Sequence, residues 1–165
     1  MVEQKIKKDD NSHWAFDEIM DIESKHGFTS TFFFAARNKL DQHANYKYDV
    51  PYNIEDVEFI RLLENMNNRK FEIGLHISYF AKKDVKYIIE EKIKLERIAG
   101  RSILGARHHF WQIGENEERT LEMHVNAGLK YDSSIAFNDT PGYRRNVALA
   151  FYPFNKETQT RVNNL

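Results

Sequence analysis

The chain has 165 residues, 41% of them hydrophobic and 30% charged, which is the composition of one ordinary globular domain. Its 24 basic and 25 acidic residues nearly cancel, so we expect neither nucleic acid nor an anionic membrane surface as a partner. The absence of cysteine excludes disulfides, thiolate metal sites and a cysteine nucleophile. The sequence shows neither a signal peptide nor an apolar stretch of membrane-spanning length, and this predicts a cytoplasmic location.

The first half of the chain predicts two helices and two strands. A helix is expected over residues 14–26, before Gly27, and the run STFFFAAR at 30–37 is expected to form a strand buried on both faces. A polar, tyrosine-rich loop follows, and Asn53 is a candidate cap for the second helix. The run FEIGLHIS at 71–78 alternates as a strand does.

The second half continues the alternation. A helix is expected from Asp84 to Gly100, a strand over 101–111, a helix over 118–128, and strands over 131–137 and 147–154. Units of about 30 residues that alternate strand and helix predict an α/β fold with a parallel sheet. A closed barrel needs about eight strands, and only four or five are visible. The sheet is therefore expected to be open or to be part of a larger domain.

Chemically active side chains gather where the predicted parallel strands end, at the edge where α/β folds usually place their chemistry. His76 alone is most simply a histidine satisfied by a structural hydrogen bond. The edge as a whole, however, carries Arg37, His76, Ser78, Tyr79, Arg107, His108, His109, Asp132, Ser133 and Ser134. Alternation places Arg107 and His109 on one face of their strand and His108 on the other. Imidazoles and carboxylates are zinc ligands, so a divalent metal, Zn²⁺ for preference, is expected here. His13, His26, His43 and His124 are predicted to be surface or capping residues.

Four motifs in order resemble the polysaccharide deacetylase family, the NodB-homology domain of carbohydrate esterase family four. They are TFFF, EIGLHISY, GARHHF and AGLKYDSSIAF, and the ending PGYRRNVALAFYPFN is similar to a segment of the same family. The resemblance covers about residues 14–155. It is strongest to a bacterial branch whose histidine strand contains GLHxSY and whose arginine strand contains RxHY.

The resemblance implies a deformed (β/α) barrel that removes acetyl groups from a sugar polymer with a metal-bound water. His76 matches the family's first metal-binding histidine, and Arg107 matches the arginine that orients the catalytic aspartate. Asp132 falls in the later strand segment, which also contains Tyr131. His109 stands where many members have proline, and it is the candidate second metal ligand.

The sequence also departs from the family pattern. Phe80, which has no donor atom, occupies the position of the usual second metal histidine, and no strand ending in an Asp-Asp pair is present. Asp9 and Asp10 precede a helix and are interpreted as solvated residues. The histidine that serves as acid in the family has no counterpart either. We therefore expect residues 1–165 to be a single deacetylase-like domain, with a core at about 14–155, that lacks the family's first strand and last strands.

The sequence thus predicts a deacetylase-like domain for metal-assisted hydrolysis of acetyl groups on carbohydrate, inactive as this chain alone. The alternative is a non-catalytic carbohydrate-binding domain or pseudoenzyme, and a third possibility is an assembly protein that receives the missing strands from a partner. The site residues expected are Arg107 and Asp132 for catalysis, His76 and His109 for metal, and Ser78, Tyr79, Phe110 and Trp111 for substrate. Arg107 is expected to pair with Asp132 or another carboxylate. A homodimer, or residues 147–165, is expected to cover the edge of the STFFF strand.

Overall fold

The computed structural model describes residues 14–113, 117–137, 140–143, 146–155 and 158–162. The chain divides into two compact units, residues 1–30 and 31–165, which are described separately. In the first unit, α1 (Phe16–Lys25) ends before Gly27, whose φ of 74° lies in the left-handed region that glycine tolerates. Glu23 accepts a hydrogen bond of 2.9 Å from the amide of Ser30. The predicted helix and its glycine stop are confirmed.

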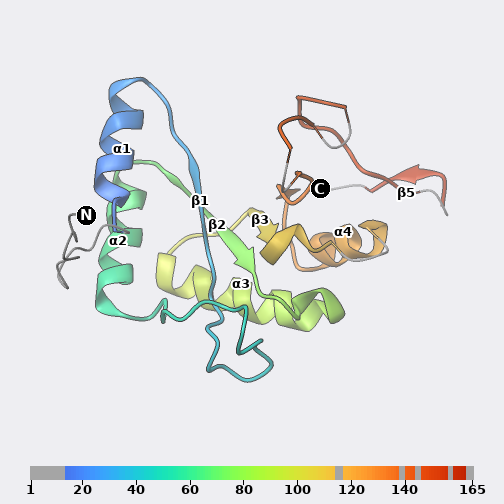
Figure 1. Ribbon diagram of the computed structural model, residues 1–165, viewed down its shortest axis with the longest axis horizontal. Helices are drawn as coiled ribbons and strands as arrows, with labels where there is room; N and C mark the ends of the chain where they lie inside the picture. The colour runs from blue at the N-terminus through green and yellow to red at the C-terminus, as the bar shows by residue number, and fades with distance from the viewer. Residues whose placement is uncertain (1–13, 114–116, 138–139, 144–145, 156–157, 163–165) are drawn as a thin grey trace, which may run out of the picture. The chain divides into compact units, whose positions relative to one another are not determined.

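The second unit is built on a four-stranded parallel sheet (Figure 1). Its strands lie in the order β1 (Thr31–Phe34), β2 (Glu72–Ile77), β3 (Gly105–His108) and β4 (Tyr131–Asp132). Three helices alternate with them along the chain: α2 (Val57–Asn68), α3 (Val85–Ala99) and α4 (Glu117–Asn126). The predicted α/β fold with a parallel sheet is confirmed.

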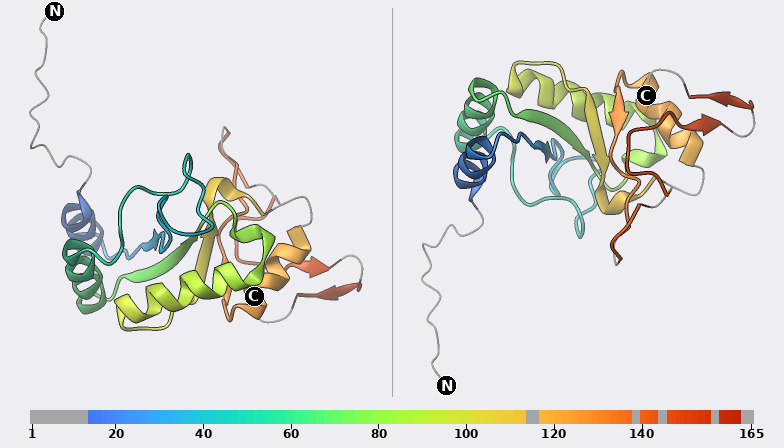
Figure 2. Two further views of the ribbon diagram at one scale, coloured as in Figure 1. Left: turned by 90° about the horizontal axis from the view of Figure 1, so that it is seen from below. Right: turned by 90° about the horizontal axis from the view of Figure 1, so that it is seen from above.

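Helices cover one face of this sheet. Both α2 and α3 contact β2, α4 contacts α3, and Figure 2 shows α3 running along the sheet. The side chains on the covered face are fully buried, among them Ile73, Leu75, Ile77 and Ala106. The opposite face carries the cross-strand partners His76 and Arg107, because successive side chains of a strand point to opposite faces. The sheet therefore has an apolar face under the helices and a polar face that can carry a site.

The ends of α3 follow directly from the sequence. The side chain of Asp84 accepts a hydrogen bond of 3.0 Å from the amide of Lys86, and Gly100 ends the helix with a φ of 67°. Between β3 and β4, Gly105 allows the Tyr131 ring to come close to the backbone. A Cβ at residue 105 would come within 1.9 Å of the Tyr131 Cζ.

The strand predicted over 101–111 is shorter than expected. It ends at His108, and residues His109–Trp111 form a single turn of 3₁₀ helix. In this turn Phe110 and Trp111 have φ values of 53° and 51°, a conformation that costs a residue with a bulky side chain about 1 kcal/mol or more. The turn redirects the chain at the point where the candidate site begins.

The strand predicted over 147–154 is wrong for all but its last residue. Only β5 (Phe154–Asn155) is a strand, and it pairs with β6 (Thr160–Arg161) in a separate antiparallel ribbon. The apolar run before it contains Leu149, which is 79% exposed, and it ends in Pro153, which has no amide hydrogen to donate. Residues 147–153 line a cavity with Tyr131, on the β4 side of the sheet and away from β1. The described residues of the 147–165 segment therefore do not cover the β1 edge.

Within the part of the chain that the structure describes, no helix combines the length and the apolar character needed to cross a membrane.

Candidate functional site

Two imidazole rings meet at the carboxyl ends of β2 and β3. His76 lies on β2, and His109 follows directly after β3, where the 3₁₀ turn begins. Nε2 of His76 and Nδ1 of His109 lie 2.8 Å apart, and the two rings are nearly perpendicular, at 76°. The predicted proximity of the two rings is confirmed, although the separation is just below the expected 3 to 5 Å and corresponds to a hydrogen bond.

Burial favours the neutral form of both histidines of this pair. Burial, together with electrostatic effects of His109 and Arg107, lowers the pKa of His76 to about 4. Burial also lowers the pKa of His109, against an opposing effect of the Asp49 carboxylate. A neutral imidazole keeps one nitrogen lone pair, and this is the form that binds a metal cation.

The imidazole pair provides nitrogen donors of the type that zinc binds, but two ligands are fewer than a zinc site normally has. Zinc sites normally use three or four protein ligands, and two ligands of one tetrahedral ion lie about 3.4 Å apart. Among the residues with described coordinates, no group of three or more His, Asp or Glu side chains could hold an ion. His76 and His109 therefore form at most part of such a site.

Aromatic rings surround the imidazole pair. Tyr79 stacks on Tyr48 with centroids 4.8 Å apart, and Phe110 contacts both His109, at 4.3 Å, and Tyr48, at 5.5 Å. Asp49 fixes the loop that supplies Tyr48, since its Oδ1 accepts a hydrogen bond of 2.8 Å from the amide of Tyr79. Such a wall suits the apolar C–H face of a sugar ring.

The substrate residues predicted from the sequence divide between this site and the protein interior. Tyr79 and Phe110 lie beside the imidazoles, and Trp111 lies in the same turn, partly buried. Ser78 does not join them. It is 2% exposed, and its hydroxyl donates a hydrogen bond to Glu91 on α3.

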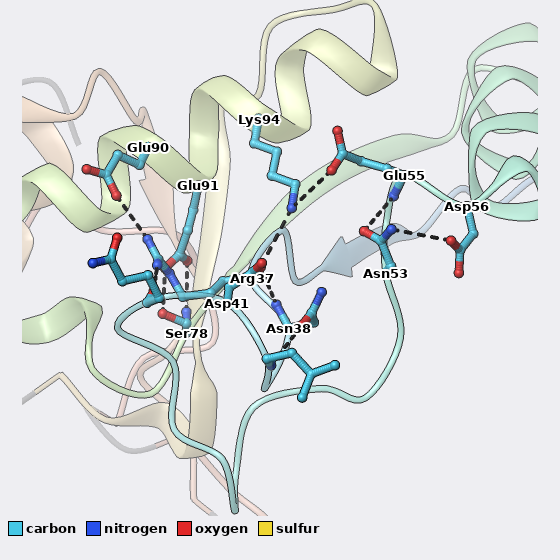
Figure 3. A network of polar contacts seen from close by, with 12 residues as sticks. Arg37, Asn38, Asp41, Asn53, Glu55, Asp56, Ser78, Glu90, Glu91 and Lys94 are labelled. Carbon is cyan, nitrogen blue, oxygen red and sulfur yellow. Dashed lines mark hydrogen bonds and ion pairs between the residues drawn. The ribbon is translucent and has the colours of Figure 1, made fainter.

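Glu91 is the centre of a buried polar network that sequence reasoning missed (Figure 3). Its Oε2 accepts a 3.0 Å hydrogen bond from the amide of Ser78, and its Oε1 lies 3.0 Å from Nε of Arg37. Burial raises the pKa of Glu91, while Ser78 and Arg37 act in the opposite direction. Ile88 and Leu95, three residues before and four after, are also buried, so helical spacing could have predicted the position of Glu91. The network connects α3 to the end of β2 beside His76.

The pairing predicted between Arg107 and Asp132 is wrong. Nε of Arg107 donates a hydrogen bond of 2.8 Å to the hydroxyl of Ser133, and its guanidinium lies 4.7 Å over the Phe33 ring. Asp132 is the register partner of Ala106, so its side chain points to the helix-covered face, opposite to Arg107.

Asp132 belongs to a second histidine pair beneath the sheet. Its carboxylate accepts a 2.7 Å hydrogen bond from the amide of Ser134 and lies 3.4 Å from Nδ1 of His124. Nε2 of His124 in turn lies 2.8 Å from Nε2 of His108. The prediction that His124 is a surface or capping residue is wrong, because it is completely buried.

The structure therefore groups His76, His109, Tyr79 and Phe110 and separates them from Ser78 and Asp132. Arg107 lies on the same face of the sheet as His76, as its direct cross-strand partner.

No protein-family model and no curated protein matches the chain. Among solved structures, the chain is similar to a protein from Mycobacterium smegmatis assigned to the polysaccharide deacetylases, with 16% identity and a TM-score of 0.54. That match covers 73% of this chain and 38% of the other. A mutant of a CE4 family pseudoenzyme matches with 13% identity and a TM-score of 0.50, over 72% of this chain and 38% of the other. At these identities the similarity is one of fold. The chain spans less than two fifths of the length of either structure.

Proposed function

We propose that this chain is a polysaccharide deacetylase-like domain that acts on acetylated carbohydrate through the imidazole pair. The observation that carries the proposal is the convergence of His76 and His109 at the carboxyl ends of adjacent parallel strands. The fold supports the proposal, because the similar structure from Mycobacterium smegmatis is assigned to the polysaccharide deacetylases.

His76 and His109 are the two ligands that this chain offers to a divalent metal ion, for which zinc suits the nitrogen donors. Such an ion would polarise an acetyl carbonyl and make water a better nucleophile near neutral pH. The described residues form no group of three ligands around the pair. The carboxylate that acts on the pKa of His109 belongs to Asp49, and it accepts a hydrogen bond from the amide of Tyr79. We therefore expect metal binding by the pair and no hydrolysis by the isolated chain.

Metal titration tests whether His76 and His109 bind a metal ion. We expect the full chain to bind one Co²⁺ or Zn²⁺ in calorimetry, and the affinity to fall about tenfold or more in His76→Ala and in His109→Ala, because each variant removes one of two ligands. His26→Ala, which removes an exposed imidazole at the end of α1, is the matched control. Equal binding by the wild type and His76→Ala would contradict the assignment of the ligands.

A second function, carbohydrate binding without catalysis, is favoured by one specific observation. The Tyr48–Tyr79 stack and Phe110 form an aromatic wall beside a pair for which the described residues supply no third ligand. The second similar structure is described as a mutant of a pseudoenzyme, so this fold also occurs without activity.

Acetate release from chitin-like oligomers, measured with added Zn²⁺ or Co²⁺, separates the two functions. No release, together with sugar binding that weakens in Tyr79→Ala, would favour the binding domain. Release that disappears in His76→Ala would establish the enzyme and would mean that a residue outside the described cluster serves as base.

A further inference from the structure

A cavity of about 1010 Å³ lies on the β4 side of the sheet. Arg107, Tyr131 and Ser133 line it from the strands, and residues 147–153 line it from the C-terminal segment. Neither His76 nor His109 is among its lining residues, so the cavity is distinct from the imidazole pair. It adjoins the pair through Arg107, which is the cross-strand partner of His76. The volume is that of a small-molecule site.

Arg107, the partly buried cation of this cavity, has no anionic partner among the residues that the structure describes. Within the described ranges, no carboxylate lies within 4.0 Å of the Arg107 guanidinium, and Ser133 accepts the hydrogen bond from its Nε. The side chain is nevertheless partly buried, over the Phe33 ring. A partly buried guanidinium normally has a carboxylate or phosphate group to which its fork of N–H donors can bind. The terminal nitrogens of Arg107 are therefore available to an anionic ligand.

The remaining walls of the cavity suit a ligand with an apolar ring face. Tyr143, Leu149, Phe151 and Tyr152 all line it, and each is more than 40% exposed. The lining residues also supply the Arg107 guanidinium, the Ser133 hydroxyl and the exposed ammonium of Lys130. Asp132 is a lining residue too, but its carboxylate is held on the opposite face of the sheet by Ser134 and His124. Arg107 is the partly buried one of the two cations, and the planar fork of its N–H donors matches the two oxygens of a carboxylate.

We infer that this cavity binds a carboxylate-bearing sugar, with its carboxylate on Arg107 and its ring against the aromatic side chains. The inference rests on the proposed function, which it deepens by naming an acidic carbohydrate as the ligand. It also gives Arg107 a role other than the orientation of a catalytic aspartate.

Binding measurements on the full, metal-free chain test this inference. The probes are a glucuronate-containing disaccharide, the neutral N-acetylglucosamine disaccharide and inorganic phosphate. We expect the acidic disaccharide to bind at least about tenfold more tightly than the other two probes, and to lose at least about tenfold in Arg107→Met, because a charge-assisted hydrogen bond is lost. Arg107→Lys should recover part of the affinity. Arg97→Met, which removes an exposed arginine of α3, should leave it unchanged.

Chemical-shift mapping on the wild type keeps the test decisive even if Arg107→Met does not fold. The acidic disaccharide should shift the amides of Tyr131, Ser133 and Phe151 and leave those of Tyr48 and Tyr79 unchanged. Equal affinity for the neutral sugar, equal affinity for phosphate, or shifts confined to Tyr48 and Tyr79 would each overturn the inference. Failure of metal binding at His76 and His109 would instead overturn the proposed function, since sugar binding is measured here without metal.

Discussion

Two histidine pairs lie back to back at the end of β3, because His108 and His109 are adjacent and their side chains leave the backbone on opposite faces. His109 meets His76 on the polar face, whereas His108 meets His124 under the helices. Burial lowers the pKa values of all four rings. In the buried pair formed by His108 and His124, Asp132 lies beside Nδ1 of His124 and favours a proton on that nitrogen. Nε2 of His124 can then accept a hydrogen bond from His108.

The buried pair of His108 and His124 should make the stability of the fold depend on pH. Burial lowers the pKa of His124 to about 4, against 6.5 for an ordinary histidine. Between these values the unfolded chain binds more protons than the folded chain, so stability is lost as the pH falls from about 6.5 to about 4. A difference of about 2.5 pKa units corresponds to about 3 kcal/mol. Urea unfolding at pH 7 and pH 4 should show this loss in the wild type and a smaller one in His124→Asn.

The control for this prediction is His26→Asn, at the exposed end of α1, which should keep the pH dependence of the wild type. An identical loss of stability in His124→Asn and in the wild type would show that His124 does not titrate as its burial requires.

The burial of His124 was predictable, but its partners were not. Thr120, Leu121 and Ala127 are buried and lie on the same helical face, so spacing alone places His124 toward the sheet. The contact with Asp132 depends on the register of β4 against β3. A shift of one residue would exchange Asp132 for Ser133 on that face. Sequence reasoning placed Asp132 correctly at the strand edge but could not choose its face.

At the scale of the elements, α3 holds the end of β2 in place. Glu91 reaches from the buried face of the helix to both the amide and the hydroxyl of Ser78, two residues after His76. The same carboxylate binds Arg37, whose guanidinium also donates to the carbonyl of Gln42 in the loop that leads to Tyr48. One helix residue therefore connects the strand of His76 to the loop of the aromatic wall.

Removing this carboxylate should be costly. Glu91→Ala leaves Arg37 buried without its main partner, and breaking a buried ion pair in this way typically costs about 3 to 5 kcal/mol. Glu90→Ala is the matched control, because Glu90 binds the same guanidinium at 3.0 Å but its side chain is 59% exposed. Glu90→Ala should lower the free energy of unfolding by about 1 kcal/mol or less. Chemical unfolding of the two variants measures the difference, and equal losses would refute the role of Glu91.

The amides of Ser78 and Tyr79 give an independent measurement, since Glu91 and Asp49 accept their hydrogen bonds. In Glu91→Ala we expect faster hydrogen exchange at both amides, with little change at Ala106 in the middle of the sheet.

The sequence predicted helices and strands correctly where residues within the element itself, such as helix caps, determine its ends. The aspartate cap and the glycine stop of α3 were both identified from the sequence. The prediction failed over residues 147–154, because a continuous run of apolar residues also occurs in a segment that lines a cavity. Whether such a run becomes a strand depends on a neighbouring strand with unpaired backbone groups, and this information lies outside the run itself.

At the scale of the whole molecule, the described sheet has β1 at one edge, a strand of three phenylalanines. Just beyond this strand, the chain is covered by its own loop. The amide of Ala35 donates a hydrogen bond of 2.9 Å to the Tyr52 hydroxyl, and Asn38 forms a parallel bridge with Val50. Among the strands that the structure describes, β1 is adjacent to β2 alone.

An apolar strand at the edge of a sheet favours association, because a sheet edge is a template along which another strand can form backbone hydrogen bonds. We therefore predict that the chain dimerises through β1 and that sedimentation velocity will show a dimer whose fraction grows with concentration. Successive amides of a strand point to opposite edges, so one of Phe32 and Phe33 faces β2 and the other faces outward. Hydrogen exchange at the outward-facing amide should slow as the dimer forms, because the new ladder would protect it. Ala106, in a central strand, is the internal control and should exchange at a rate independent of concentration. A chain that remains monomeric, with exchange at Phe32 and Phe33 equally fast at all concentrations, would show that association does not satisfy this edge.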